Sequence, residues 1–203
     1  MTMVIPDLGF RVMNKVALDD IVGIAAYEKT REKSRQRIIE LKKRRRISVG
    51  DNVTLVFENR DTVIFQIQEM MRAEKIADLD KIREEIEVYN ELIPARGELS
   101  ATLFLEIEDQ THLREDLLQF LGIDEAVYLK VGGHSIHARF EEGRSKEDKI
   151  SAVQYIKFPF DEAALQAFVK GEKAELVIDH PNYQARTSIE SEMRQSLMED
   201  LTG

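Results

Sequence analysis

The sequence predicts an α+β fold in which an N-terminal helical region is followed by a mainly antiparallel sheet with packed helices. Before residue 95 most apolar residues recur at helical spacing, whereas after it several segments alternate apolar and polar residues. Strands and helices do not alternate regularly, as a parallel α/β fold would require. Pro94 and Gly97 mark the change of pattern. We therefore expect one α+β domain over residues 1–203, or two closely joined subdomains: 1–95, mainly helical with one strand, and 96–203, an antiparallel sheet with helices.

The first half of the chain is expected to form mostly helix. Residues 1–17 show no clear period, and Asp19 and Asp20 are typical of the residues that cap a short helix beginning at Ile21. The remaining predicted elements are a long helix over about 27–45, a turn over 48–51, a half-buried strand over 53–57 and a helix over 79–92.

Residues 62–72 fit two structures. Alternation over Thr62 to Gln68 favours the second strand of a hairpin, but Val63, Ile67 and Met71 also recur at helical spacing. The helical period continues beyond the usual length of a strand, so we expect a helix with Asp61 as its N-cap.

The second half is expected to contain strands with interspersed helices. Thr187 and Glu190 stand at the spacing of a capping box, which predicts that a final helix begins there. Its apolar stripe requires burial in the core or against another chain and consists of Ile189, Met193, Leu197 and Leu201. The other predicted elements are strands over 101–107, 151–158 and 174–178 and helices over 111–121 and from Asp161 to Gly171.

Gly132 and Gly133 predict a hairpin whose register follows from the two-residue turn. Val131 pairs with His134 in this register, which places Tyr128 directly opposite His137. Arg139 follows on the same face. Tyr128, His137 and Arg139 are therefore the candidate catalytic residues if the protein is an enzyme, although a polar sheet face exposed to solvent is the commoner arrangement.

Composition excludes several classes of protein. The 203 residues include 43% hydrophobic and 33% charged residues, which is typical of a folded protein with a sizeable core. No cysteine is present, so the chain forms no disulfide and offers no thiolate ligand. No apolar run approaches the ~20 residues that cross a bilayer, and the N-terminus does not resemble a signal peptide. We expect a cytoplasmic protein that does not enter a membrane.

Charge is divided unevenly along the chain. Residues 28–46 contain ten Lys/Arg and three Asp/Glu, a net charge of +7, so the remainder of this −9 chain carries −16. The basic segment consists of Lys42, Lys43, Arg44, Arg45 and Arg46. Such a segment can bind nucleic-acid phosphates. The pI of about 5.1 and the lack of interleaved aromatic residues favour instead a helix end that faces acidic protein surface, in this chain, a second copy or a partner.

The remaining polar residues predict neither a metal site nor a cofactor site. His134 and His137 lie three apart on one strand, so their side chains point to opposite faces. The chain has no HExxH motif or Glu-x-x-His pattern. The polar residues Glu58, Asp61, Gln66 and Glu69 could form an acid–base pocket. We favour a structural role for them as caps and as partners of Arg60 and Arg72, including an i, i+3 pair between Glu69 and Arg72.

Three stretches carry a resemblance to a known family: LKKRRRISVGDNVTLVFENRDTVIFQIQEMMR from Leu41, YNELIPARGELSATLFLEI from Tyr89 and GRSKEDKISAVQYIKFPF from Gly143. Together they resemble an uncharacterised bacterial family, a domain of unknown function. Such proteins tend to be encoded beside rubrerythrin-like and iron–sulfur oxidoreductase genes, so the resemblance implies a supporting role in peroxide or redox metabolism. It carries no established catalytic residue.

These observations favour a non-catalytic accessory protein that acts through contact with a protein partner or as a homo-oligomer. The basic segment and the final amphipathic helix are the expected surfaces. Two alternatives remain: an enzyme that uses Tyr128, His137 and Arg139, and a nucleic-acid-binding protein that uses the basic segment.

Overall fold

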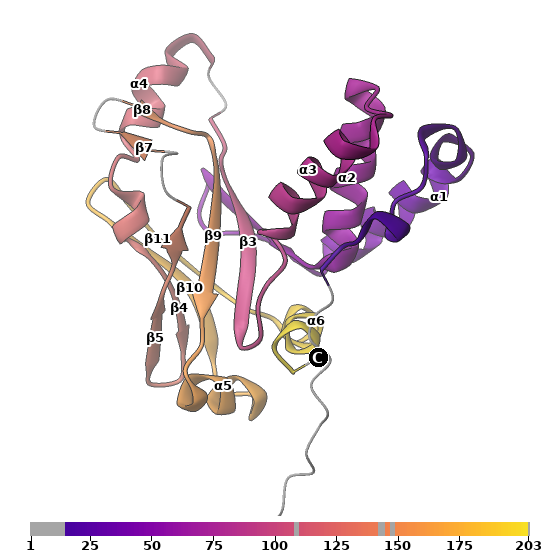
Figure 1. Cartoon of the computed structure of the whole chain (residues 1–203). Helices are drawn as coiled ribbons and strands as arrows, with labels where there is room; N and C mark the ends of the chain where they lie inside the picture. The colour runs from indigo at the N-terminus through magenta and orange to yellow at the C-terminus, as the bar shows by residue number, and fades with distance from the viewer. Residues whose placement is uncertain (1–14, 108–109, 142–144, 147–148, 203) are drawn as a thin grey trace, which may run out of the picture.

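The computed structural model describes residues 15–107, 110–141, 145–146 and 149–202 and confirms the α+β class. Its main feature is a pair of antiparallel sheets with strand orders β1-β2-β3-β9-β6 and β11-β10-β4-β5 (Figure 1). The first sheet consists of β1 (Arg46–Ser48), β2 (Val53–Glu58), β3 (Glu98–Leu105), β9 (Val153–Pro159) and β6 (Arg139–Phe140). The second consists of β11 (Tyr183–Ser188), β10 (Ala174–His180), β4 (Val127–Val131) and β5 (His134–His137). Two short strands, β7 (Ser145–Lys146) and β8 (Lys149–Ile150), pair separately.

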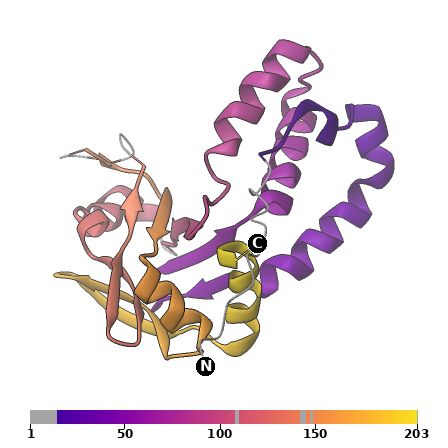
Figure 2. The same cartoon turned by 60° about the horizontal axis from the view of Figure 1, so that its bottom comes forward.

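Three helices extend together from one side of the sheets, and we call them the arm (Figures 1 and 2). They are α1 (Ile24–Lys43), α2 (Arg60–Glu74) and α3 (Leu79–Asn90). The two main sheets together with α5 (Glu162–Val169) and α6 (Ser191–Thr202) form what we call the body. The helix α4 (Leu113–Leu118) stands between two 3₁₀ turns, η2 (Gln110–His112) and η3 (Ile123–Glu125), and a further turn, η1 (Leu18–Asp20), precedes α1. None of these helices has the length and apolar character needed to cross a membrane.

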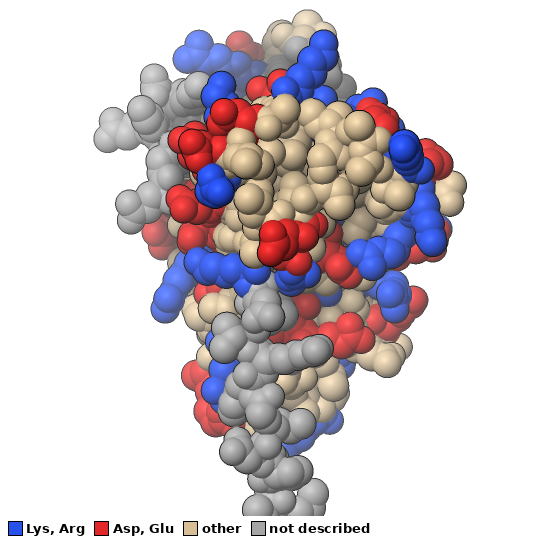
Figure 3. All heavy atoms as spheres, turned by 45° about the vertical axis from the view of Figure 1, so that its right-hand side comes forward, with Lys and Arg blue, Asp and Glu red and all other residues tan. Residues whose placement is uncertain are grey.

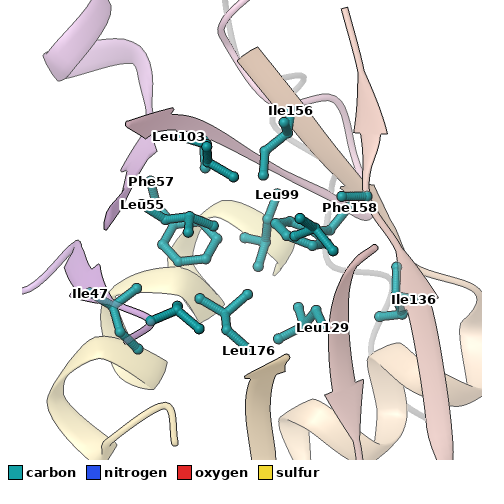
Figure 4. Packing of buried hydrophobic residues seen from close by; sticks show 14 of the residues in the cluster. Ile47, Leu55, Phe57, Leu99, Leu103, Leu129, Ile136, Ile156, Phe158 and Leu176 are labelled. Carbon is teal, nitrogen blue, oxygen red and sulfur yellow. The ribbon is translucent and has the colours of Figure 1, made fainter. Parts of the chain in front are cut away.

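The main hydrophobic core lies between the two sheets (Figure 4). Leu55, Phe57 and Phe158 project from the first sheet toward Leu129 and Leu176 of the second, and each is at most 1% exposed. This burial of apolar side chains from two facing sheets is the expected source of most of the body's stability.

A second, smaller cluster holds the arm together. It contains Val63, Ile67 and Met71 of α2 together with Ile82 and Ile86 of α3. The buried residues of the long helix α1, Tyr27 and Ile38, belong to neither cluster. The expected division into 1–95 and 96–203 stays a prediction, although the smaller cluster draws mainly on the first of these segments.

Most of the predicted elements are confirmed. Helix α3 and strands β3, β9 and β10 occur where expected, and Asp161 caps α5 by accepting a hydrogen bond from the Ala164 N–H. The register of the hairpin is also correct, with Tyr128 opposite His137 and Val131 opposite His134.

The choice of helix over hairpin strand for residues 62–72 is confirmed by α2, but the predicted N-cap is wrong. Asn59 caps the helix, because its Oδ1 accepts from the Thr62 N–H while the Thr62 hydroxyl accepts from the Asn59 N–H. Asp61 lies inside the first turn, where its carboxylate accepts a hydrogen bond from Arg37.

Two edge strands were not predicted from the sequence. Residues 46–48 form β1 and residues 183–188 form β11, so Thr187 belongs to a strand and does not cap the final helix. Its hydroxyl donates to the Ser48 carbonyl, which joins the edges of the two sheets. The helix α6 begins only at Ser191.

Three further expectations are corrected. Asp19 and Asp20 lie inside the turn η1, and Gly23 is the N-cap of α1. The helix predicted over 111–121 is shortened to α4 between two 3₁₀ turns. Finally, β2 is not half-buried: all six of its residues are buried, because its outer face is also covered, with Glu58 held between Gln66 of α2 and Thr102 of β3.

Candidate interaction surface

The basic segment divides into one buried and four outward residues. Arg45 follows the end of α1 and is 0% exposed. Its guanidinium donates to the Phe57 and Glu58 carbonyls of β2 and to the Ser196 carbonyl of α6, and it forms an ion pair with Asp200. Arg45 therefore cannot take part in an exposed interaction site, which corrects the prediction for this residue. Its role is to join α1, β2 and α6.

The ion pair of Arg45 and Asp200 has a strongly desolvated carboxylate. Burial raises the pKa of Asp200 to about 6, although the attraction of Arg45 and its hydrogen bond act in the opposite direction. The Ser196 hydroxyl also accepts from Arg45, so several polar groups compensate the buried guanidinium.

Three of the other four basic residues, Lys43, Arg44 and Arg46, line a groove, and Lys42 lies next to them in sequence but does not line it. Lys42 is half-buried, and Lys43, Arg44 and Arg46 are exposed. The groove has a volume of about 390 Å³ and is bounded by the end of α1, the strand β1 and the start of α6. Its lining residues are Lys43, Arg44, Arg46, Ile47, Ser48, Thr187, Ser188, Glu190, Glu192 and Met193.

Acidic neighbours already engage part of this charge. The Lys43 ammonium lies 2.7 Å from Glu40, and the Arg46 guanidinium lies 2.7 Å from Glu106. Both pairs are exposed, so each is expected to be weak and exchangeable. Within the part of the chain that the structure describes, Lys42 and Arg44 form no ion pair.

Other basic residues of the net +7 stretch 28–46 face acidic residues of α2. Arg31 donates two 2.8 Å hydrogen bonds to Glu69, and the Tyr27 hydroxyl donates to the same carboxylate. These contacts, above all the hydrogen bond from Arg31, lower the pKa of Glu69. Burial and the nearby Glu69 raise the pKa of Tyr27. On this side of the molecule, charges of both signs surround an area without Lys, Arg, Asp or Glu (Figure 3).

The four polar residues considered as an acid–base pocket, Glu58, Asp61, Gln66 and Glu69, do not all lie together. Glu58 is buried beside Gln66, whereas Asp61 pairs with Arg37 and Glu69 pairs with Arg31. The predicted pair of Glu69 and Arg72 does not form. Arg72 reaches across to Glu28 of α1, so these charges link α1 to α2.

The three candidate catalytic residues are also divided. The rings of Tyr128 and His137 lie 4.9 Å apart on the second sheet, as the register predicts. Arg139 belongs to β6 at the edge of the first sheet, where it stands opposite Lys157. The turn of the chain from one sheet to the other after His137 could not be seen in the hairpin pattern.

The final apolar stripe is not available for another chain. Ile189, Met193, Leu197 and Leu201 are all buried in the core between the sheets, which resolves the alternative left open by the sequence. The apolar stripe is therefore removed from the expected interaction surfaces, although the start of α6 still borders the groove through Glu192.

The histidines have separate environments. His180 is buried, with Nε2 2.8 Å from the Leu121 carbonyl, and His112 lies 3.3 Å from Glu115 on the surface. Among the described residues, no three His, Asp or Glu side chains are grouped in a way that could hold a metal ion.

A polar pocket of about 570 Å³ was not predicted. It lies where the β1–β2 turn, α4 and the β10–β11 turn meet, and Asp51, Asp116 and Tyr183 are among its lining residues. The Tyr183 hydroxyl donates to the Val49 carbonyl and accepts from the Asn52 N–H. A β-carbon on Gly50, whose φ is +73°, would stand 2.3 Å from that hydroxyl oxygen. These segments lie up to 134 residues apart in sequence, so no local pattern could reveal the pocket.

The architecture defines a class of protein: two antiparallel sheets with a helical arm and a cationic groove at their junction. The family described as "Protein of unknown function (DUF3501)" matches residues 15–201, and the chain belongs to this family. It is also similar to a protein from Burkholderia pseudomallei K96243, whose crystal structure is described as that of a novel protein of unknown function. The two chains are 33% identical, the match covers 93% of this chain and 100% of the other, and the TM-score is 0.87. A comparison with curated proteins found no match.

Proposed function

We propose that the protein is a non-catalytic accessory protein that binds an acidic protein surface through Lys42, Lys43, Arg44 and Arg46. The observation that carries this proposal is the anchoring of Arg45. Because the Arg45 side chain is fixed between β2 and α6, the backbone of the residues on either side of it is held beside the groove. It is therefore expected to be less mobile than a helix end without such contacts. Fixed cations lose less side-chain entropy on binding than mobile ones.

Charge complementarity favours a protein over a nucleic acid as the partner. The whole chain has a net charge of −9, which opposes the approach of a polyanion such as DNA or RNA. Glu190 and Glu192 also line the groove and would repel phosphates there. A protein surface can present acidic groups to the cations and other groups to these two carboxylates. The redox association implied by the family resemblance supports, as part of this proposal, a partner in a cytoplasmic peroxide or redox system.

The test compares two charge reversals on one helix region. The first variant carries Lys42→Glu and Arg44→Glu, and the control carries Lys29→Glu and Lys33→Glu at exposed sites of α1. Both change the net charge by the same amount. Pull-down from the native cell, followed by quantified binding of the purified partner, is expected to show loss only in the first variant.

Light scattering on the same proteins tests whether a second copy is the acidic surface. In that case the wild type is a dimer or larger and only the first variant is monomeric. The proposal is wrong if the wild type is a monomer without a specific partner, or if both variants bind equally. Submicromolar binding of DNA or RNA at physiological salt, lost only in the first variant, would replace it with the nucleic-acid alternative.

A further inference from the structure

A small pocket lies where the end of α3 meets the first sheet, away from the cationic groove. Its volume is about 220 Å³, smaller than the ~300–1,000 Å³ typical of pockets for drug-sized ligands. The lining residues are Glu91, Leu92, Ser100, Arg139, Phe140, Glu141, Tyr155, Ile156 and Lys157. They come from the connection between α3 and β3, from the strands β3, β9 and β6, and from the residue after β6. The pocket therefore lies beside the point where the end of the arm meets the first sheet.

Two cations face each other on neighbouring strands at this pocket. Arg139 of β6 is the register partner of Lys157 of β9. Like charges at directly opposed positions of an antiparallel pair destabilise it unless something neutralises them. Lys157 has a partner, since its ammonium lies 3.3 Å from Glu98. Arg139 is exposed and forms no ion pair or hydrogen bond with a side chain in the described part of the molecule.

A serine hydroxyl is the second polar group considered in this pocket. Ser100 of β3 is the register partner of Lys157 on the other side of β9 and is only 3% exposed. Its hydroxyl makes no hydrogen bond to another described residue and is not enclosed, since every enclosed side-chain polar atom among the described residues has a partner. A hydroxyl that is open to a pocket can donate a hydrogen bond to an acceptor that enters it.

Apolar groups supply the rest of the wall. Leu92 is 7% exposed and Ile156 is 1% exposed, and both line the pocket with Phe140. The carboxylate of Glu91 stands at the outer end, where its side chain is 72% exposed and lies 3.8 Å from Lys15. The described groups that still lack a counterpart are thus a guanidinium and a hydroxyl, and both can donate hydrogen bonds to a carboxylate.

We infer that this pocket binds a small organic carboxylate with an apolar body. The carboxylate accepts hydrogen bonds from Arg139 and Ser100 and lies within the field of Lys157, while the apolar body contacts Leu92 and Phe140. This inference does not depend on the proposed protein interaction, which uses the opposite end of the first sheet.

Three probes of one shape separate the charge from the apolar body: benzoate, benzamide and benzylamine. Isothermal titration calorimetry with the whole protein is expected to detect benzoate in the millimolar range or tighter, with the neutral and cationic analogues at least tenfold weaker. Hexanoate is expected to bind as a second, non-aromatic carboxylate. Equal binding of benzoate and benzamide, or no binding of either carboxylate at 20 mM, would refute the inference.

The variants locate the site. Arg139→Gln is expected to weaken benzoate about tenfold, and Ser100→Ala to weaken it less. Arg186→Gln, on the exposed edge strand β11, is the matched control and is expected to leave the affinity unchanged. The Lys42→Glu, Arg44→Glu variant should also bind benzoate normally, so failure here and failure of the interaction proposal are distinguishable. Equal loss in Arg139→Gln and in Arg186→Gln would assign the effect to general charge and overturn the site.

Discussion

The arm and the body of this protein are stabilised by different interactions. In the body, two sheets enclose a large apolar core, and side chains such as Phe57 and Phe158 are completely buried. In the arm, the 20-residue helix α1 buries only Tyr27 and Ile38 and is linked to α2 by three ion pairs. A helix that buries so little apolar surface depends on its charged contacts to stay in place.

Three ion pairs that differ in burial allow the contributions of these charged contacts to stability to be measured and compared. Arg45 and Asp200 are buried at the point where the arm joins the body, with side chains 1% and 5% exposed. Arg31 and Glu69 are each 28% exposed, and Arg37 and Asp61 are 66% and 46% exposed. The cost of breaking a pair rises with burial, because the remaining charge cannot be solvated by water.

Breaking the buried pair is expected to have the largest effect. Asp200→Ala leaves Arg45 buried with only carbonyl and hydroxyl partners and should lower the free energy of unfolding by about 3–5 kcal/mol. Urea denaturation followed by circular dichroism measures this. The double variant Arg45→Met, Asp200→Leu removes both buried charges and should lose less than the single variant.

If the double variant is no more stable than Asp200→Ala, the hydrogen bonds from Arg45 to the Phe57 and Glu58 carbonyls contribute more to the free energy of unfolding than the ion pair itself. The junction would then resemble a backbone clamp, and the contrast between buried and exposed pairs would lose its main support.

Prediction of structure from the sequence succeeded where a local pattern determines structure. The period of Val63, Ile67 and Met71 distinguished α2 from a strand, and Gly132-Gly133 fixed the register of Tyr128 against His137. It failed where partners are distant. Nothing near Arg45 shows that its partner stands 155 residues away, so it was grouped with its exposed neighbours.

The same limit explains the edge strands and the pockets. β1 has three residues, too few for an alternation to be recognised, and β11 reads YQARTS, which has little apolar character. Ser100 and Lys157 were missed as site residues because they meet only when β3 and β9 pair. Arg139 was selected, but for the wrong sheet, since the chain changes sheets after His137.

The stability contributed by the partly buried pair of Arg31 and Glu69 should change with pH in the opposite direction to that contributed by the buried pair of Arg45 and Asp200. The pKa of Glu69 is lowered from its usual 4.5 in the folded state, chiefly by the hydrogen bond from Arg31. Its contribution to stability is therefore present above pH 4.5 and is lost as the pH falls through the folded-state pKa. Glu69→Gln should cost about 1 kcal/mol at pH 7 and progressively less as the pH falls below 4.5.

Asp200 reverses this sign. Its pKa rises from 3.8 in the unfolded chain to about 6 in the fold, so the part of its contribution that depends on protonation is complete below pH 3.8 and is lost as the pH rises through 6. The contact with Arg45 supplies a further part that remains. The stability difference between wild type and Asp200→Asn should shrink from pH 4 to pH 7, while the difference between wild type and Glu69→Gln should grow. Parallel slopes for the two variants would contradict the assignment of desolvation to one carboxylate and of ion pairing to the other.

The exposed pair is expected to have the smallest effect, and it is the sharpest test of how α1 is held. Arg37→Ala should change the free energy of unfolding by less than about 0.5 kcal/mol, because both partners remain solvated and salt screens their attraction. A double-mutant cycle with Asp61→Ala measures the coupling, and raising NaCl from 0.05 to about 1 M should abolish it, since the Debye length falls to about 3 Å. Asp61 lies in the first turn of α2, where its charge also favours the helix dipole, so Asp61→Ala alone should cost more than Arg37→Ala. A coupling above about 1 kcal/mol that survives high salt would show that the three pairs act as one network, and α1 would then be held cooperatively along its length.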